Sequence, residues 1–245
     1  MKISNVLAAA SLTIVGISAA TAANAAVIYL NFEGIATYPT GSGTVIGNYY
    51  NGGAASNGAV GPNYGVQFTS GGQLLCLNTA AANCSNTSKG GQGIAASQYY
   101  ALYFPTANPT MNVAAGFDTG FSFTYTAPFA TGTTVNIYSG LNGTGSLLAT
   151  LALPLTTTAT CDTTISRGAQ FCPFAPASLG FAGIARSVVF GGTVNSQVFD
   201  DFTFGSTFVG GAVPEPATWG MMILGFGMIG AASRSRKVKT TVNFA

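Results

Sequence analysis

Aromatic and hydroxyl side chains alternate along Phe121-Ser-Phe-Thr-Tyr-Thr126, and this alternation is the clearest indication of the fold. Successive side chains of a β-strand point to opposite faces, so the three aromatic rings share one face and the three hydroxyl groups share the other. A strand with one apolar and one polar face fits an antiparallel sheet that covers a core on one side only. The pattern therefore predicts a half-buried strand over residues 121–126.

Strand-like stretches continue on both sides, separated by clusters of glycine and asparagine. Residues 134–139, 140–145 and 146–153 have the pattern of a strand, a turn and a second strand. Other predicted strands cover residues 27–32, 66–69, 74–77, 99–104, 187–190 and 197–204, and residues 47–65 are predicted to form a long loop. No part of this body keeps a helical period or a solenoid repeat. We predict an all-β fold, an antiparallel β-sandwich of the jelly-roll type, over residues 26–205.

Charged residues make up only 6% of the 245 residues, against roughly 25% in ordinary soluble proteins. This low charge is typical of extracellular bacterial β-proteins. The charged residues of the body are Lys89, Arg167, Arg186, Glu33, Asp118, Asp162, Asp200 and Asp201, which give it a formal charge of −2. Scattered cations on a weakly acidic body cannot neutralise a row of phosphates, so we expect no nucleic-acid partner.

Histidine is absent from the chain. Because histidine is the commonest general base and transition-metal ligand, its absence removes Ser-His and Cys-His catalytic pairs. A secreted hydrolase that uses a pair of carboxylates stays open as an alternative, and it would need two acids ~5–10 Å apart across a cleft. We expect a protein without catalytic activity.

Residues 1–25 have the features of a secretory signal peptide, predicted to be helical. Lys2 precedes an apolar run over residues 6–20, and Ala23-Asn-Ala25 is a small-residue cleavage site. We therefore predict export through the Sec translocon and removal of this segment by signal peptidase after Ala25.

The end of the chain combines three features in a fixed order. Pro214-Glu215-Pro216 is rigid and extended, because each proline fixes φ. Residues 217–232 then run without a charge, and as a helix they would cover ~24 Å of a hydrocarbon core of ~30 Å. Trp219 suits a membrane interface, and a basic cluster marks a cytoplasmic end. The cluster consists of Arg234, Arg236, Lys237 and Lys239.

From these features we predict a transmembrane helix over residues 217–232 that holds a precursor in the inner membrane. The alternative is a buried core helix. Residues 206–212 are predicted to be a flexible linker, and residues 240–245 a short tail.

This order of features over residues 213–239 resembles the PEP-CTERM sorting signal. Pro214-Glu215-Pro216-x-x-Trp219-Gly-Met-Met is similar to the proteobacterial variant PEPxxWAMM, with Gly220 where that variant usually has alanine. The resemblance implies a Gram-negative protein that a membrane protease-transpeptidase, exosortase, cuts near Pro-Glu-Pro. It further implies delivery to the cell surface or to an exopolysaccharide-rich extracellular matrix. Residues 50–68, 137–145 and 199–205 also resemble pieces of PEP-CTERM precursor bodies.

The body contains four cysteines, at positions 76, 84, 161 and 172. In the oxidising compartment that an exported chain reaches, an even number of cysteines predicts disulfides. Three connectivities are open, and we favour Cys76–Cys84 with Cys161–Cys172, because each pair brackets a polar loop. Each bridge would contribute about 2–3 kcal/mol in the chain-entropy model. A zinc site is disfavoured by the lack of Cys-x-x-Cys spacing and of histidine.

Glu33, Asp200 and Asp201 are the candidate metal ligands. Glu33 ends the first predicted strand and the aspartates lie in the last, and these two strands are often neighbours in jelly rolls. The arrangement resembles the structural calcium site of carbohydrate-binding jelly rolls. Regular alternation predicts that only one of the two aspartates points inward. In the alternative interpretation these carboxylates accept hydrogen bonds at turns and at the sheet edge, and no cofactor is required.

Tyrosine rings suit the apolar faces of sugars, which predicts a stacking platform. The candidates are Tyr49, Tyr50, Tyr64, Tyr99, Tyr100 and Tyr103. Ordinary core packing is the alternative for these rings. The favoured function is thus an exported, non-catalytic surface or matrix protein, and the alternative is a carbohydrate-binding module that contacts exopolysaccharide.

Overall fold

The computed structural model of the protein describes residues 27–69, 71–80, 84, 91–92, 98–129, 132–159, 161–166, 171–192, 194–210 and 216–234. Predicted functional residues that lie outside this part of the chain are Ala23, Ala25, Pro214, Glu215, Arg236 and Lys237. For Pro216, Trp219 and Arg234, the structure describes the helical backbone alone.

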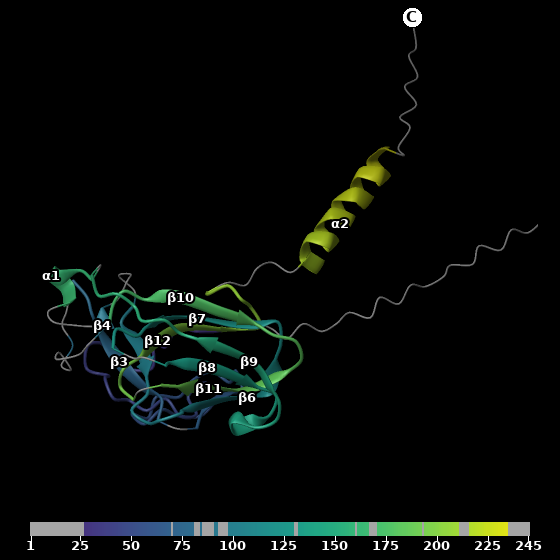
Figure 1. Cartoon of the computed structure of the whole chain (residues 1–245). Coiled ribbons are helices and arrows are strands. Elements are labelled where there is room, and N and C mark those ends of the chain that lie inside the picture. The colour runs from purple at the N-terminus through teal and green to yellow at the C-terminus, as the bar shows by residue number, and fades with distance from the viewer. Residues whose placement is uncertain are drawn as a thin grey trace, which may run out of the picture.

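Two sheets pack face to face around an aromatic core (Figure 1). The seven-stranded sheet has the order β10-β7-β12-β5-β3-β4, and β1 pairs with β12 as well. Its strands are β1 (Ile28–Leu30), β3 (Gln73–Asn78), β4 (Gly91–Gln92), β5 (Tyr100–Tyr103), β7 (Gly120–Thr126), β10 (Ala175–Gly180) and β12 (Val198–Phe204).

The five-stranded sheet has the order β2-β6-β11-β8-β9. Its strands are β2 (Val66–Phe68), β6 (Thr110–Phe117), β8 (Thr134–Tyr138), β9 (Leu147–Ala152) and β11 (Ala185–Gly191). The described strand pairs are antiparallel except for β3 with β4. The predicted antiparallel β-sandwich is therefore confirmed, and its jelly-roll form stays a prediction.

β7 contains the alternating aromatic and hydroxyl residues 121–126. Phe121 and Phe123 are fully buried, and their rings lie 5.2 Å and 6.0 Å from the ring of Phe202. Ser122 and Thr124 alternate with them and point to the outer face of the sheet. The predicted division of this strand into an aromatic face and a hydroxyl face is confirmed.

β12 lies in the middle of the seven-stranded sheet and has three neighbours. On one side both of its halves pair with β7. On the other side, Val198 and Phe199 pair with β5, and Phe202 to Phe204 pair with β1. The expectation that the first and last strands are neighbours is therefore confirmed.

A β-bulge interrupts β12 at its centre. Asp200 faces Thr124 and Thr203 faces Ser122, so two residues of β12, Asp201 and Phe202, oppose a single residue of β7. Asp201 has a φ of 57°, an unusual value for a residue with a side chain. The extra residue keeps the phenylalanines on either side of it turned toward the core.

Three strands were not predicted from the sequence. For two of them, β6 and β10, the amino-acid composition explains why. β6 contains Ala114-Ala-Gly116, where its register with β11 shifts, so no alternation is visible there. β10 contains Pro176, which lacks a backbone donor and is tolerated because β10 is an edge strand. β4, the third omission, has only two residues.

The connections follow the predicted pattern more closely. Residues 47–65 form a loop with the isolated bridges Asn51–Asn63 and Ala54–Val60. The predicted hairpin is present as β8 and β9, joined through the short 3₁₀ helix η1 (Leu141–Gly143). One four-residue helix, α1 (Thr163–Ser166), belongs to the loop that a disulfide closes.

Both favoured disulfides are present. Cys76 at the end of β3 is bonded to Cys84, and Cys161 is bonded to Cys172 beside Phe171 and Phe174 of a second small core. The side-chain oxygen of Asn78 accepts a hydrogen bond from the N–H of Cys84 at 2.9 Å. The bridges therefore tie loops at the margins of the sandwich back to its strands.

The bulge yields a prediction about two single-residue deletions in β12. Deleting Asp201 leaves a strand that alternates regularly, so Phe199, Phe202 and Phe204 still face the core and the protein should fold with a modest loss of stability. Deleting Thr203 instead turns Phe204 outward, which forfeits about 1.5–3 kcal/mol of burial and disturbs the packing around it. Thermal unfolding followed by near-ultraviolet circular dichroism compares the two. Equal stability of both deletion variants would contradict this account of the bulge.

Candidate functional site

Glu33 connects the two strands that flank β12 on one side. It lies just after β1, and its Oε1 accepts hydrogen bonds from the N–H groups of Tyr99 at 2.7 Å and Tyr100 at 3.0 Å, where β5 begins. Two backbone donors on one carboxylate oxygen hold the end of β1 against the start of β5. This interaction positions Glu33 near Asp200 and Asp201.

The bulge in β12 directs the two aspartates to different partners. Asp200 is only 2% exposed, and its Oδ1 accepts a hydrogen bond from the N–H of Asp201 at 2.8 Å. The carboxylate of Asp201 accepts hydrogen bonds from the hydroxyls of Tyr29 and, at 3.3 Å, Thr124. Of the two aspartates, Asp200 is buried and Asp201 is half-buried, and the bulge between them replaces the regular alternation on which the prediction was based.

Burial and mutual repulsion shift the acidity of this group. Burial, and then the charge of Asp201, raises the pKa of Asp200 well above its usual value. Burial also raises the pKa of Glu33, although hydrogen bonds from Tyr100 and Tyr99 act in the opposite direction. Burial and the hydrogen bond to Asp201 raise the pKa of Tyr29. A proton is therefore retained at this cluster more readily than on free carboxylates.

The three carboxylates do not fit the calcium site that the sequence suggested. In the part of the chain that the structure describes, no three His, Cys, Asp or Glu side chains are placed to hold a metal ion. Backbone N–H groups and hydroxyls hydrogen-bond to these carboxylates instead. This geometry supports the alternative interpretation, in which they accept hydrogen bonds within the fold.

The predicted tyrosine platform is not assembled. Tyr49, Tyr50 and Tyr100 are buried in the core, and the hydroxyl of Tyr50 accepts the N–H of Phe32 at 3.1 Å. Tyr64 is exposed, but its ring stacks on Tyr50. Tyr99 and Tyr103 are half-buried. These rings pack within the fold, because they lie on strands and on a loop that folds against the core.

A different surface carries an open cavity. After β12 the chain turns back over the outer face of the seven-stranded sheet in residues 205–210, which we call the return segment. The N–H of Gly205 bonds to the carbonyl of Gly120 at 3.0 Å, and the N–H of Gly210 to Oγ1 of Thr203 at 3.0 Å. The predicted flexible linker is thus held on the body over its first residues.

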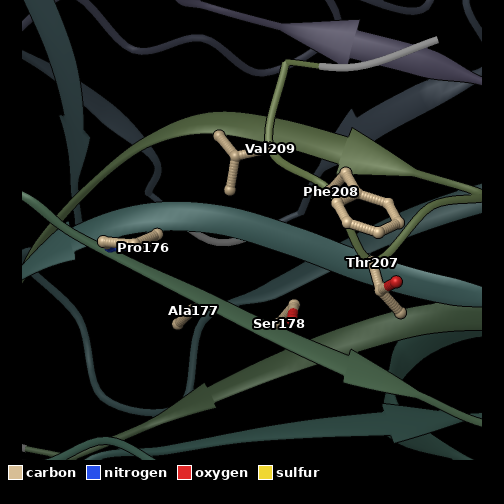
Figure 2. Close-up of a pocket in the computed structure, with 6 residues that line it drawn as sticks. All are labelled: Pro176, Ala177, Ser178, Thr207, Phe208 and Val209. Carbon is tan, nitrogen blue, oxygen red and sulfur yellow. The ribbon is translucent and has the colours of Figure 1, made fainter. Parts of the chain in front are cut away.

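Between the return segment and β10 lies a cavity of about 330 Å³, which we call the outer-face pocket. Figure 2 shows its lining residues, Pro176, Ala177 and Ser178 along β10 and Thr207, Phe208 and Val209 on the return segment. Phe208 is 65% exposed. This site was not predicted from the sequence, although Phe208 is an isolated aromatic residue in a stretch of Gly, Ser, Thr and Val.

Ser122 lies beside the outer-face pocket on β7. It stands in register with Ser178 of β10 on one side and Thr203 of β12 on the other. Its Oγ is buried and has no hydrogen-bond partner among the described residues. An unsatisfied buried hydroxyl costs about 1–3 kcal/mol, so Ser122 is a locally unfavourable position beside the pocket.

Helix α2 (Pro216–Arg234) follows the body. Its large apolar side chains Met221, Met222, Ile223, Leu224, Phe226, Met228 and Ile229 are exposed. Within the described residues, however, no helix combines the length and the apolar content that crossing a membrane requires. The predicted membrane-spanning character of residues 217–232 is therefore not supported.

A family model for the PEP-CTERM protein-sorting motif matches residues 212–237 of the chain. The chain therefore carries this motif at its C-terminus, as the sequence analysis expected. The match covers the segment that contains α2 and leaves out the sandwich. No curated protein matches the chain as a whole.

Several solved structures show a distant likeness to the sandwich. A family 6 carbohydrate-binding module has 17% identity and a TM-score of 0.31, over 54% of this chain and 81% of its own. A carbohydrate-binding module of Cellvibrio mixtus lichenase 5A, in complex with cellotriose, has 12% identity and a TM-score of 0.32, over 58% and 91%. The K3 adhesin domain of Porphyromonas gingivalis Lys-gingipain has 14% identity and a TM-score of 0.33, over 48% and 80%.

The raised pKa values of Asp200 and Glu33 predict a pH dependence of folding stability. An acid whose pKa is higher in the folded than in the unfolded state stabilises the fold below the unfolded value of about 3.9, and that contribution is lost as the pH rises through the folded value. Replacing Asp200→Asn keeps the acceptor for the N–H of Asp201 and removes the charge. We expect it to stabilise the protein at pH 7 by about 1 kcal/mol or more, and to flatten the decline of the melting temperature above about pH 4.

Asp162→Asn is the matched control. Hydrogen bonds from Thr164 lower the pKa of this exposed aspartate, so its contribution to folding stability is lost as the pH falls, opposite to that of Asp200. Thermal unfolding over a pH series measures both variants. A pH profile of Asp200→Asn that runs parallel to that of the wild type would contradict the assignment.

The poor fit to a metal predicts that calcium leaves the fold unaffected. Because protein donors already hydrogen-bond to Glu33, Asp200 and Asp201, a millimolar excess of Ca²⁺ or of a chelator should not move the melting temperature. A rise with Ca²⁺ that disappears in Asp201→Asn would show that these carboxylates rearrange around the ion.

Proposed function

We propose that this chain is the exported precursor of a non-catalytic surface or matrix protein, which an exosortase of a Gram-negative bacterium recognises through its C-terminal segment. The observation that carries the proposal is the sorting motif at residues 212–237. The signal peptide over residues 1–25, with cleavage after Ala25, accounts for export. The two disulfides fit an oxidising compartment outside the cytoplasm.

Helix α2 supports recognition within the membrane region. Seven large apolar side chains are exposed on it. A helix that is apolar on all sides packs against lipid or against another helix. A methyl group built on Gly220, Gly225 or Gly227 would meet no atom within 4 Å, so a second helix can approach this backbone closely. We propose that α2 holds the precursor at the inner membrane while exosortase acts on it.

The body contributes no catalytic step in this proposal. Its five described carboxylates all accept hydrogen bonds from neighbouring groups, including Thr119 at Asp118 and Thr164 at Asp162. Structural roles of this kind support a binding or matrix protein over a hydrolase that uses a pair of acids.

Carbohydrate binding is the second candidate function. The outer-face pocket favours it, since an exposed aromatic ring beside two hydroxyl-bearing side chains is a surface that sugars recognise. On this view exopolysaccharide is the partner of the body, and exosortase is the partner of the tail.

Sorting is tested by the mass and the location of the chain in its own host. We expect the mature protein to lack residues 1–25 and the segment beyond the Pro-Glu-Pro site. In a strain without exosortase, or after alanine replacement of Pro214, Glu215 and Pro216, the C-terminal segment should remain and the protein should stay with the inner membrane fraction. The control Thr218→Ala should be processed normally. Recovery of the intact 245-residue chain from the wild-type cytoplasm would refute the proposal.

A further inference from the structure

We propose that the outer-face pocket binds one neutral sugar unit of a polysaccharide, with the ring of Phe208 as the stacking surface. This inference rests on the second candidate function and gives it a site and a ligand class. The site lies on the outer face of β10 and β7, away from the core, and it includes a segment that the sequence alone suggests is a linker (Figure 2).

The return segment fixes the position of Phe208. Its own N–H bonds to Oγ of Ser206 at 3.0 Å, and two residues later the N–H of Gly210 bonds to Oγ1 of Thr203. The bonds of Gly205 to Gly120 and of Gly210 to Thr203 hold the backbone on the sheet before and after Phe208, while 65% of its side chain stays exposed. A positioned aromatic ring can bury its face against the C–H groups of a sugar at little cost in conformational entropy.

Hydroxyl groups surround this ring on the side of β10 and β7. Ser178 and Thr207 line the pocket, and Ser122 stands opposite Ser178 in the sheet, where paired side chains lie about 5 Å apart. Each hydroxyl both donates and accepts, as the hydroxyls of a sugar do. Oγ of Ser122 is buried beneath the pocket, so the hydroxyls that a sugar in the pocket can reach are those of Ser178 and Thr207.

The charges on this sheet select a neutral ligand. None of the six lining residues is charged, and Thr124, the neighbour of Pro176 in the sheet, hydrogen-bonds to the carboxylate of Asp201. The nearby negative charge disfavours uronic acids, phosphates and sulfates. A volume of about 330 Å³ is at the small end of ligand sites, which fits a single sugar ring with the rest of the polymer in solvent.

The test uses the full-length protein in a detergent without a sugar headgroup, and measures its retardation in gels containing barley β-glucan, galactomannan, xyloglucan or alginate. We expect binding to at least one of the three neutral polysaccharides and none to alginate. Phe208→Ala should weaken that binding at least about fivefold. Ser178→Trp, which fills the pocket from an exposed position, should do the same.

Phe129→Ala is the matched control, because Phe129 is another exposed phenylalanine, 52% exposed, and is not among the residues that line the pocket. It should leave the affinity unchanged within about twofold, and thermal unfolding checks that all three variants are folded. Binding that neither Phe208→Ala nor Ser178→Trp weakens would overturn the site and leave carbohydrate binding as a function.

The remaining outcomes decide the ligand class. Failure to bind any of the polysaccharides would overturn both the site and the second candidate function. Binding to alginate alone would overturn the neutral class. Retention of the protein on phosphatidylcholine vesicles through Phe208, without retardation by polysaccharide, would replace the sugar with a lipid surface. None of these results bears on sorting by exosortase.

Discussion

The structure depends on the position of β12, which must bury three phenylalanines while pairing with three strands. Its sequence contains one residue more than regular alternation allows, and the bulge at Asp201 accommodates it. The bulge keeps Phe199, Phe202 and Phe204 in the core and sends the carboxylate of Asp201 to Tyr29 and Thr124. Core packing and the polar outer face of the sheet are thus set by the same local irregularity. Glu33 completes the arrangement by joining β1 to β5, the two strands that pair with β12 on the side opposite β7.

The sequence was sufficient for the features that depend on local pattern. Alternation identified β7, turn residues identified the β8–β9 hairpin, and loop spacing identified both disulfides. Features that depend on partners far apart in the chain could not be found in this way. The bulge in β12 is defined only against β7, and the outer-face pocket exists only because residues 205–210 return onto β10. The tyrosines suggested a sugar-binding platform because their number is visible in the sequence. Which of the rings are buried depends on how the loop of residues 47–65 folds, and the sequence alone does not show this.

The sorting segment at the C-terminus and the β-sandwich are separate parts of the chain. The sorting motif and α2 carry apolar side chains that the described body does not cover, whereas the sandwich has its own core, its own disulfides and a polar outer face. The return segment is where the two meet, since it is hydrogen-bonded to the sheet up to Gly210 and the motif begins at residue 212. The last described residue of the body, Gly210, lies beside Tyr29 of β1.

The pairing of β1 with β12 also determines where the body begins and ends. Ile28 lies opposite Phe204, so the first and last strands of the sandwich start and finish at neighbouring points. A domain whose ends meet in this way can be spliced into a surface loop of a host protein, or rejoined and opened elsewhere, without unravelling its sheets. The sandwich is accordingly a natural module for display, because a foreign scaffold would need to supply only two adjacent attachment points.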